Sequence, residues 1–155
     1  SYVSSVSALS YYKLITQIPN EVFCATLKKP RNIGKINFFH TDYFFGYKEE
    51  SYENFKILIA EPEKAIIDSF SIVPVSLFEE AIGEINTDKM IGYLKKIKKS
   101  SIIKRVGYLM EKNGQDIYDN VKSMINYKYI LLDPLLKNKG KKNKKWGIIN
   151  NTNDN

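Results

Sequence analysis

The segment from Glu61 to Phe70 sets the architecture of this chain, because strand-like sequence precedes it and helix-like sequence follows it. Pro62 fits the first helical position, where its missing N–H costs nothing. Glu63 lies in the first turn, where the positive end of the helix dipole favours a carboxylate. Apolar residues then recur at helical spacing, namely Ala65, Ile66, Ile67 and Phe70. We therefore expect a helical part of the chain to begin here.

Residue patterns on either side of this segment predict an α+β fold. Helical periodicity predicts helices at 4–15, 61–70 and 76–85, from residue 86 or 87 to residue 99, from residue 100 or 101 to residue 112, and at 116–125. Enrichment in β-branched and aromatic residues predicts strands at 21–28, 35–39, 52–59, 127–133 and 146–150. Turn residues predict a connection at 29–34, and lysines make 138–145 a basic loop. We expect a small mixed sheet of about four to five strands, packed with a bundle of about five helices.

The length of 155 residues fits one ordinary domain, which we place at 1–150. Its β-rich part is expected at about 1–60 plus 127–150 and its helical part at about 61–126, and 151–155 is expected to be a frayed tail. The hydrophobic content of 43%, with 13% aromatic residues, excludes wholesale disorder. The first residue is serine rather than methionine, so we expect a trimmed product or an excised fragment of a longer protein.

The sequence also indicates the cellular compartment in which the protein is expected. No apolar run approaches the roughly 18 residues of a membrane span, and no signal peptide is visible. The lone Cys24 cannot form an internal disulfide and lies in an apolar run, so we expect a buried thiol in a reducing compartment. These features predict a cytoplasmic protein with no membrane partner.

The net charge of +7 is unevenly distributed. Residues 1–94 hold 9 Lys/Arg and 12 Asp/Glu, a net charge of −3, whereas residues 95–155 hold 15 and 5, a net charge of +10. This asymmetry predicts that the second half faces a polyanion, with nucleic acid the first candidate. The alternative is an ordinary solvated surface.

Two basic clusters carry most of this positive charge. The first comprises Lys95, Lys96, Lys98, Lys99, Lys104 and Arg105, and the second comprises Lys137, Lys139, Lys141, Lys142, Lys144 and Lys145. Lysine and arginine supply phosphate contacts, which position a protein on nucleic acid without reading its sequence. We therefore predict contacts with DNA, or alternatively with RNA, through both clusters. The alternatives are a solvated helix face and a mobile loop.

Patterns that suggest catalysis are weak. His40 and Asp42 resemble a base with its orienting acid, or two metal ligands, but a third ligand at a recognisable spacing is missing. Glu61, Glu63 and Lys64 resemble the acidic and basic set of metal-dependent nucleases, yet Pro62 interrupts the alternation that such sites need. A phosphate-binding glycine loop is also missing. We expect a chain that is not an enzyme and that holds no metal and no cofactor.

Several short segments, taken in order, resemble the C-terminal domain of the AbiEi-type antitoxins. They are Tyr2-Val3-Ser4, Ser7-Ala8-Leu9-Ser10-Tyr11-Tyr12, Ile18-Pro19, Ala25-Thr26, Phe45-Gly46-Tyr47, Pro62 to Asp68, Lys104 to Leu109, Leu132-Asp133-Pro134, Gly140, and Trp146 to Asn150. Within them the family-motif residues expected to be structural are Pro62, Glu63, Lys64, Asp68, Gly107, Tyr108, Asp133, Pro134 and Trp146. The order and spacing of the segments cover nearly all of residues 2–150.

The resemblance implies a prokaryotic regulator of a type IV toxin–antitoxin, abortive-infection system. The toxin of such a system is nucleotidyltransferase-like, and direct contact with it is not required. Family members usually carry an N-terminal winged helix that binds their promoter, and by this resemblance we expect this sequence to correspond to the domain after it. The resemblance therefore implies an antitoxic role with support for DNA binding. The alternative is a nucleic-acid-binding or dimerisation module unrelated to a toxin, and the oligomeric state is left open.

Overall fold

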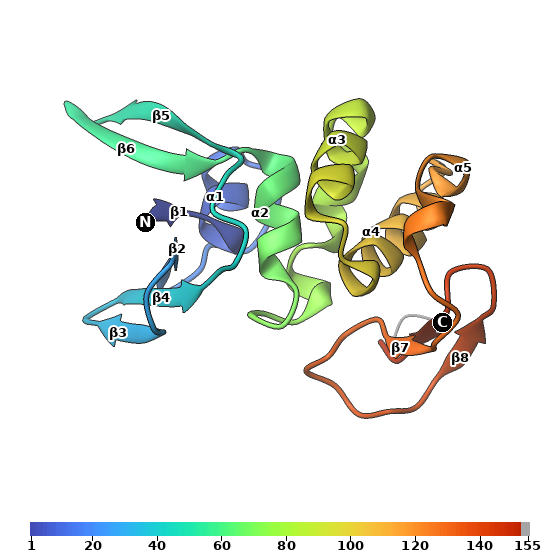
Figure 1. Cartoon of the computed structure of the whole chain (residues 1–155). Coiled ribbons are helices and arrows are strands. Elements are labelled where there is room, and N and C mark those ends of the chain that lie inside the picture. Colours follow the sequence, from blue (N-terminus) through green and yellow to red (C-terminus); the bar gives the residue numbers. More distant parts are fainter. Residues whose placement is uncertain (153–155) are drawn as a thin grey trace.

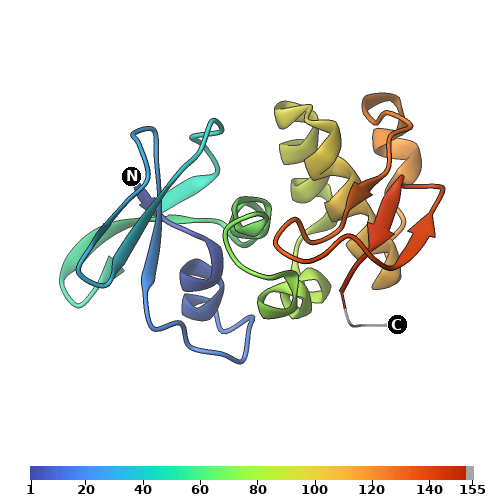
Figure 2. The same ribbon diagram turned by 90° about the horizontal axis from the view of Figure 1, so that it is seen from below.

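A computed structural model describes residues 1–152 and has two lobes joined through helix α2 (Figure 1). The first lobe holds a mixed sheet with α1 and α2, and the second holds α3, α4 and α5 with a small second sheet. Seen from below, the two sheets lie at opposite ends of the molecule (Figure 2). The predicted α+β class is confirmed. The strands are more numerous than expected, with a six-stranded and a three-stranded sheet within residues 1–152.

The larger sheet has the strand order β3-β4-β2-β1-β6-β5. Its strands are β1 (Tyr2–Val3), β2 (Val22–Thr26), β3 (Arg31–Ile33), β4 (Ile36–His40), β5 (Tyr47–Tyr52) and β6 (Phe55–Ala60). The pairs β2–β4 and β1–β6 are parallel, and the other neighbours are antiparallel. Cys24 is buried in β2, as expected.

Three of these strands were not predicted. β1 has only two residues, too few to show an alternation, and it lies between β2 and β6 in the middle of the sheet. β3 lies inside the expected connection 29–34 and pairs with β4 across a turn at Gly34, whose φ of +59° suits glycine. β5 precedes the expected strand 52–59, which is interrupted by a turn at Glu53 and Asn54, both at positive φ. β3 and β5 are edge strands, where exposed polar residues hide the alternation that marks a buried strand.

Two helices cover the larger sheet and lead to the second lobe. They are α1 (Ser5–Tyr11) and α2 (Pro62–Ser69). α1 is shorter than the predicted 4–15, since Lys13 adopts a positive φ of 61°. Ser4 precedes α1 but makes no capping bond, because its hydroxyl donates to Asp68. α2 begins at Pro62, as expected, and is buried along nearly its whole length.

The second lobe begins with two short 3-10 helices in place of the α-helix predicted at 76–85. These are η1 (Val75–Leu77) and η2 (Glu79–Glu84). Ser76 does not cap a helix here, because Phe78 breaks the helical geometry with a φ of −130°. The ring of Phe78 packs edge-on against Phe70, with ring centroids 5.0 Å apart. Ser76 and Glu79 form a capping-box pattern that favours an α-helix from this point, but burial of the Phe78 side chain outweighs it.

The remaining helices are α3 (Thr87–Ile97), α4 (Ser100–Lys112), α5 (Tyr118–Val121) and η3 (Lys122–Met124). Asn86 caps α3, since its side chain accepts a hydrogen bond from the backbone N–H of Lys89. Ser100 and Ser101 do not cap α4; the Ser100 hydroxyl instead accepts from the backbone N–H of Asn126. The helix predicted at 116–125 is divided between α5 and η3.

The smaller sheet has the order β7-β9-β8 and packs on α4. Its strands are β7 (Ile130–Leu131), β8 (Lys141–Asn143) and β9 (Ile148–Asn150), so part of the predicted basic loop 138–145 is a strand. Asn151, predicted to be frayed, is buried and donates from Nδ2 to the backbone oxygen of Asp133 at 2.8 Å. The predicted tail is therefore shorter than 151–155, and positions 153–155 lie outside the described residues.

Candidate nucleic-acid interface

The turn between α3 and α4 presents the exposed part of the first basic cluster. Lys95 and Lys96 lie in the last turn of α3, where the negative end of the helix dipole favours cations. Lys98 ends the helix in the left-handed conformation, and Lys99 precedes α4. All four side chains are exposed, and within residues 1–152 none of them forms an ion pair. Their positive charge is thus available to a partner.

Lys104, predicted to contact nucleic acid, lies elsewhere. It is only 1% exposed, and its ammonium group donates to Asn126 Oδ1 at 2.6 Å and to the backbone oxygen of Lys128. Burial lowers the pKa of this lysine, and the nearby charge of Lys128 lowers it further. The prediction is corrected here: Lys104 ties α4 to the segment before β7 and does not present its charge at the surface.

Arg105 is half-buried and makes contacts within the protein. Its Nε donates to the backbone oxygen of Leu131 at 2.9 Å, which joins α4 to β7. Burial lowers the pKa of its guanidinium, and the nearby Asp133 partly offsets this effect. Arg105 also lines a cavity of about 210 Å³ between the lobes, together with Lys99 and His40. It serves the structure first and contributes little to an open basic surface.

The second basic cluster surrounds β8. Lys141, Lys142 and Lys144 are exposed there, as are Lys137 and Lys139 in the preceding loop. Lys145 differs, because its ammonium group pairs with Glu111 and, at 2.8 Å, with Asp116 Oδ2. These hydrogen bonds raise the pKa of Lys145 and lower the pKa of Asp116. The two carboxylates neutralise Lys145, so we remove it from the predicted phosphate contacts.

The family-motif residues of the first lobe meet in one buried network. Lys64 Nζ donates to Asp68 Oδ1 at 2.6 Å and to the hydroxyl of Tyr2 at 2.8 Å. The hydroxyls of Tyr2 and Ser4 both donate to Asp68 Oδ2 at 2.8 Å. Burial lowers the pKa of Lys64 and raises the pKa of Asp68, while the contact between them opposes both shifts.

The segment Phe45-Gly46-Tyr47 closes this network. The Lys64 ammonium lies 5.2 Å from the centroid of the Phe45 ring, and Tyr47 stacks on Tyr2 with centroids 4.9 Å apart. A Cβ at Gly46 would lie 2.7 Å from Lys64 Cγ, so only glycine fits here. Three segments that are far apart in the sequence therefore meet at Lys64. Glu63, next to Lys64, is also buried and accepts from the backbone N–H of Asn86.

The family-motif residues of the second lobe meet around Trp146. The ring of Trp146 lies against Gly107 of α4, where an added Cβ would come within 2.2 Å of it. The Tyr108 hydroxyl accepts from Asn150 Nδ2 at 3.1 Å. A Cβ at Gly140 would meet the backbone oxygen of Asn150 at 1.9 Å. These contacts fix the smaller sheet on α4.

Asp133, which precedes Pro134, joins this second group to η1. Its carboxylate accepts from the backbone N–H of Val75 at 2.9 Å and of Leu135 at 3.0 Å. Its own backbone N–H donates to Asn151 Oδ1 at 2.9 Å. Asp133 is fully buried, so it acts as a connection within the second lobe.

The candidate catalytic residues do not form a convergent set. His40 Nε2 lies 2.8 Å from Asp42 Oδ1 at the exposed end of β4, and this hydrogen bond raises the pKa of His40. Glu61 instead binds Lys89 at 2.6 Å and accepts from the Tyr93 hydroxyl. Glu63 and Lys64 face Asn86 and Asp68, as described above. Because the three side chains turn to different partners, they do not build the nuclease arrangement.

A pocket beside the second basic cluster was not predicted. It has a volume of about 530 Å³ and is lined by Tyr118, Tyr127, Tyr129, Lys122 and Lys144, among others. Lys142 from β8 lies over the Tyr129 ring at 5.0 Å from its centroid. The sequence does hold a signal, since Tyr127 and Tyr129 lie two residues apart in the predicted strand 127–133, where they would share a face. In the structure only Ile130–Leu131 of this segment forms a strand, so both tyrosines lie before β7.

Neither a scan against protein-family models nor a search of curated proteins gives a match to this sequence. Within residues 1–152, the helices are too short or too polar to cross a membrane.

Proposed function

We propose that this chain is a non-enzymatic antitoxin and transcription-regulator domain of a type IV toxin–antitoxin, abortive-infection system in the prokaryotic cytoplasm. The observation that carries the proposal is the convergence of the segments that resemble the AbiEi-type antitoxins. In the first lobe three of them meet around Lys64, and in the second lobe four meet around Gly107 and Asp133. Residues that form one framework are expected to be retained together, which supports reading the segments as one signature.

The proposed mechanism is electrostatic attachment to DNA, with RNA as the alternative polyanion. Exposed lysines neutralise phosphates and release bound counterions, which favours binding without reading the base sequence. The lysines that the structure leaves available for this role are Lys95, Lys96, Lys98, Lys99, Lys141, Lys142 and Lys144. The chain would then neutralise a nucleotidyltransferase-like toxin by controlling its expression or by occupying its target, with no toxin complex assumed.

Co-expression with the toxin tests the antitoxic part of this proposal. A nucleotidyltransferase-like gene is expected beside the gene for this chain, and producing the chain together with that toxin should restore growth. The matched control is Gly107→Arg, whose side chain has no space beside Trp146 and which should not fold. If the toxin stays lethal with the folded chain while a longer form rescues growth, the antitoxic role does not belong to this region.

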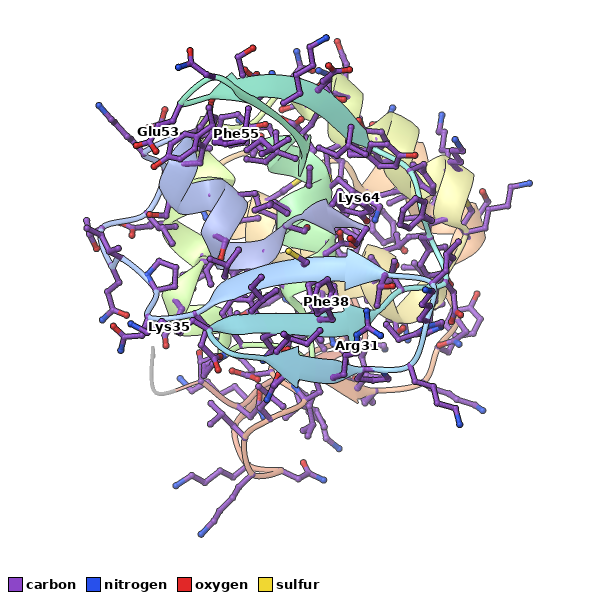
Figure 3. All side chains as sticks on the ribbon, turned by 90° about the vertical axis from the view of Figure 1, so that its left-hand side faces the viewer. Arg31, Lys35, Phe38, Glu53, Phe55 and Lys64 are labelled. Atoms are coloured by element: carbon purple, nitrogen blue, oxygen red, sulfur yellow. The ribbon has the colours of Figure 1, made fainter. Side chains whose placement is uncertain are left out.

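A second candidate function, self-association, is favoured by an apolar row on the larger sheet. The register places Val22, Ile36 and Ile33 side by side on β2, β4 and β3, and their exposed fractions are 42%, 37% and 54%. Figure 3 shows Phe38 and Arg31 on the same face, with Phe55 at the tip of the β5–β6 hairpin. Exposed apolar patches often mark interaction sites. A solution mass of a monomer at working concentration would exclude this candidate.

A further inference from the structure

The pocket beside β8 combines exposed aromatic rings with positive charge. Tyr127 is fully exposed, at 101%, and Tyr129 is 41% exposed. Tyr118 is held in place by edge-on packing against Trp146, with centroids 5.2 Å apart and an angle of 86° between the rings. The pocket therefore has one fixed aromatic wall and two rings that are open to a ligand.

The charge around these rings is positive. Lys122 and Lys144 line the pocket, and Lys142 lies over the Tyr129 ring. Asp119 lies 3.4 Å from Lys122, but both side chains are exposed, so this ion pair is weak. The other carboxylates nearby, Glu111 and Asp116, already pair with Lys145. The pocket thus favours an anionic ligand that also has a flat apolar face.

A nucleotide in a single strand has both properties. Its base offers a π face that stacks on tyrosine, and its phosphates offer negative charge to lysine. The pocket volume of about 530 Å³ lies within the usual range of roughly 300–1,000 Å³ for small-ligand sites. Paired bases in a duplex are stacked on each other and cannot cover the tyrosine rings, so the chemistry selects unpaired nucleotides.

We propose that this pocket binds single-stranded nucleic acid, with bases stacked on both Tyr127 and Tyr129 and the adjoining phosphates on Lys142 and Lys144. The proposal rests on the nucleic-acid role given above and adds a site to it. It shares Lys142 and Lys144 with that role, but it depends on the tyrosine rings, which stack on unpaired bases and which contacts with a duplex backbone do not need. The two roles therefore fail separately.

Fluorescence anisotropy with labelled oligothymidylate, oligouridylate and a duplex of equal length tests the proposal on the full chain. Tyr127→Ala should weaken single-strand binding roughly 5- to 150-fold, in line with the loss of one stacked base. Tyr127→Phe, which keeps the ring, should bind as the unchanged chain does. Tyr52→Ala removes an exposed tyrosine in the first lobe and should also leave binding intact. Because Tyr127 is fully exposed, its variants should fold normally, which circular dichroism verifies.

Duplex binding separates this proposal from the proposed function. Tyr127→Ala should leave duplex binding unchanged, whereas changing Lys95, Lys98 and Lys99 to glutamine should weaken it. Binding of either oligonucleotide with the stated tyrosine dependence supports the pocket, and the stronger of the two identifies the preferred sugar. Unchanged single-strand binding in Tyr127→Ala would overturn the proposal. It would also be overturned by a mononucleotide that binds as tightly as the oligonucleotide, or by the absence of single-strand binding.

Discussion

Lys64 and Asp68 form an ion pair that water does not reach, with side-chain exposures of 0% and 3%. Removing two charges from water is costly, and the pair is tolerated because the hydroxyls of Tyr2 and Ser4 satisfy the carboxylate. Such a pair adds specificity more than stability. It fixes β1, α2 and the segment before β5 in one arrangement.

Replacing one partner of this pair should be strongly destabilising. Lys64→Met leaves the Asp68 carboxylate buried without its cation, and we expect a loss of about 3–5 kcal/mol in the free energy of unfolding. Adding Asp68→Asn should recover part of this loss, because the amide oxygen still accepts from Tyr2 and Ser4 without a charge. Urea unfolding of both variants measures the difference. A double variant no more stable than the single one would contradict this account of the network.

Glu61 predicts a pH dependence of stability. Burial raises the pKa of Glu61, but hydrogen bonds from Lys89 and Tyr93 outweigh burial and hold the pKa below its ordinary value. The ionised carboxylate therefore stabilises the fold above its unfolded pKa of about 4.3, and this contribution is lost as the pH falls through the lower folded value. Glu61→Gln should be less stable than the unchanged chain near neutral pH, with the gap closing in acid. A gap that stays constant between about pH 3 and pH 7 would argue against the ionised contact.

At the scale of single residues, the sequence predicted which residues matter better than it predicted what their side chains contact. The family-motif segments singled out four residues that make close contacts in the structure, namely Lys64, Asp68, Gly107 and Trp146. Lys104 was misread because its burial depends on Asn126 and Lys128, which reach it only through the fold. Lys145 was misread for the same reason, since Glu111 and Asp116 are distant in sequence.

At the scale of elements, the contact between Gly107 and Trp146 holds α4 against the turn that precedes β9. A glycine in the middle of a helix normally costs roughly 0.5–1 kcal/mol relative to alanine. Here the missing side chain leaves space for the indole ring, which is fully buried. The close approach of helix and ring therefore explains why a poor helix former occupies this position.

Two glycine-to-alanine changes, one at this contact and one away from it, test how much the contact matters for stability. Gly107→Ala would place a Cβ 2.2 Å from the Trp146 ring, and overpacking of this kind costs about 1–3 kcal/mol. Gly92→Ala in α3 is the matched control, because its Cβ meets nothing within 4 Å. It should stabilise the chain by about 0.5–1 kcal/mol. Fluorescence of Trp146, the single tryptophan, follows unfolding of both. Equal effects of the two changes would mean that the close packing is not rigid.

Elements with strong periodicity were predicted well, and short ones were not. The apolar stripes of α3 and α4 predicted both helices, since each helix buries one face. α3 nevertheless ends at Ile97, before the expected Lys99, because Lys98 adopts the left-handed conformation. β3, β5 and β8 were not predicted, because they carry exposed polar residues and are recognised only by their pairing with neighbouring strands. The α-helix expected at 76–85 does not form, because Phe78 turns into the core and packs against Phe70. Capping residues nearby in the sequence do not reveal this long-range contact.

At the scale of the whole molecule, the uneven charge of the sequence survives folding in reduced form. Lys104 and Lys145 are used internally, and Arg105 is partly so, yet lysines around the α3–α4 turn and β8 stay exposed. The sequence predicted the sign and the half of the chain correctly. It did not predict that the second sheet stands apart from the first, because pairing between distant strands leaves no local mark.

The salt dependence of duplex DNA binding tests most directly the claim that these lysines face a nucleic acid. The logarithm of the binding constant should fall linearly with the logarithm of salt concentration, with a slope of roughly −0.9 for each phosphate neutralised. Changing Lys95, Lys98 and Lys99 together to glutamine should reduce the magnitude of this slope by up to about 3. A slope that the triple variant leaves unchanged, or the absence of duplex binding even at low salt, would contradict the claim.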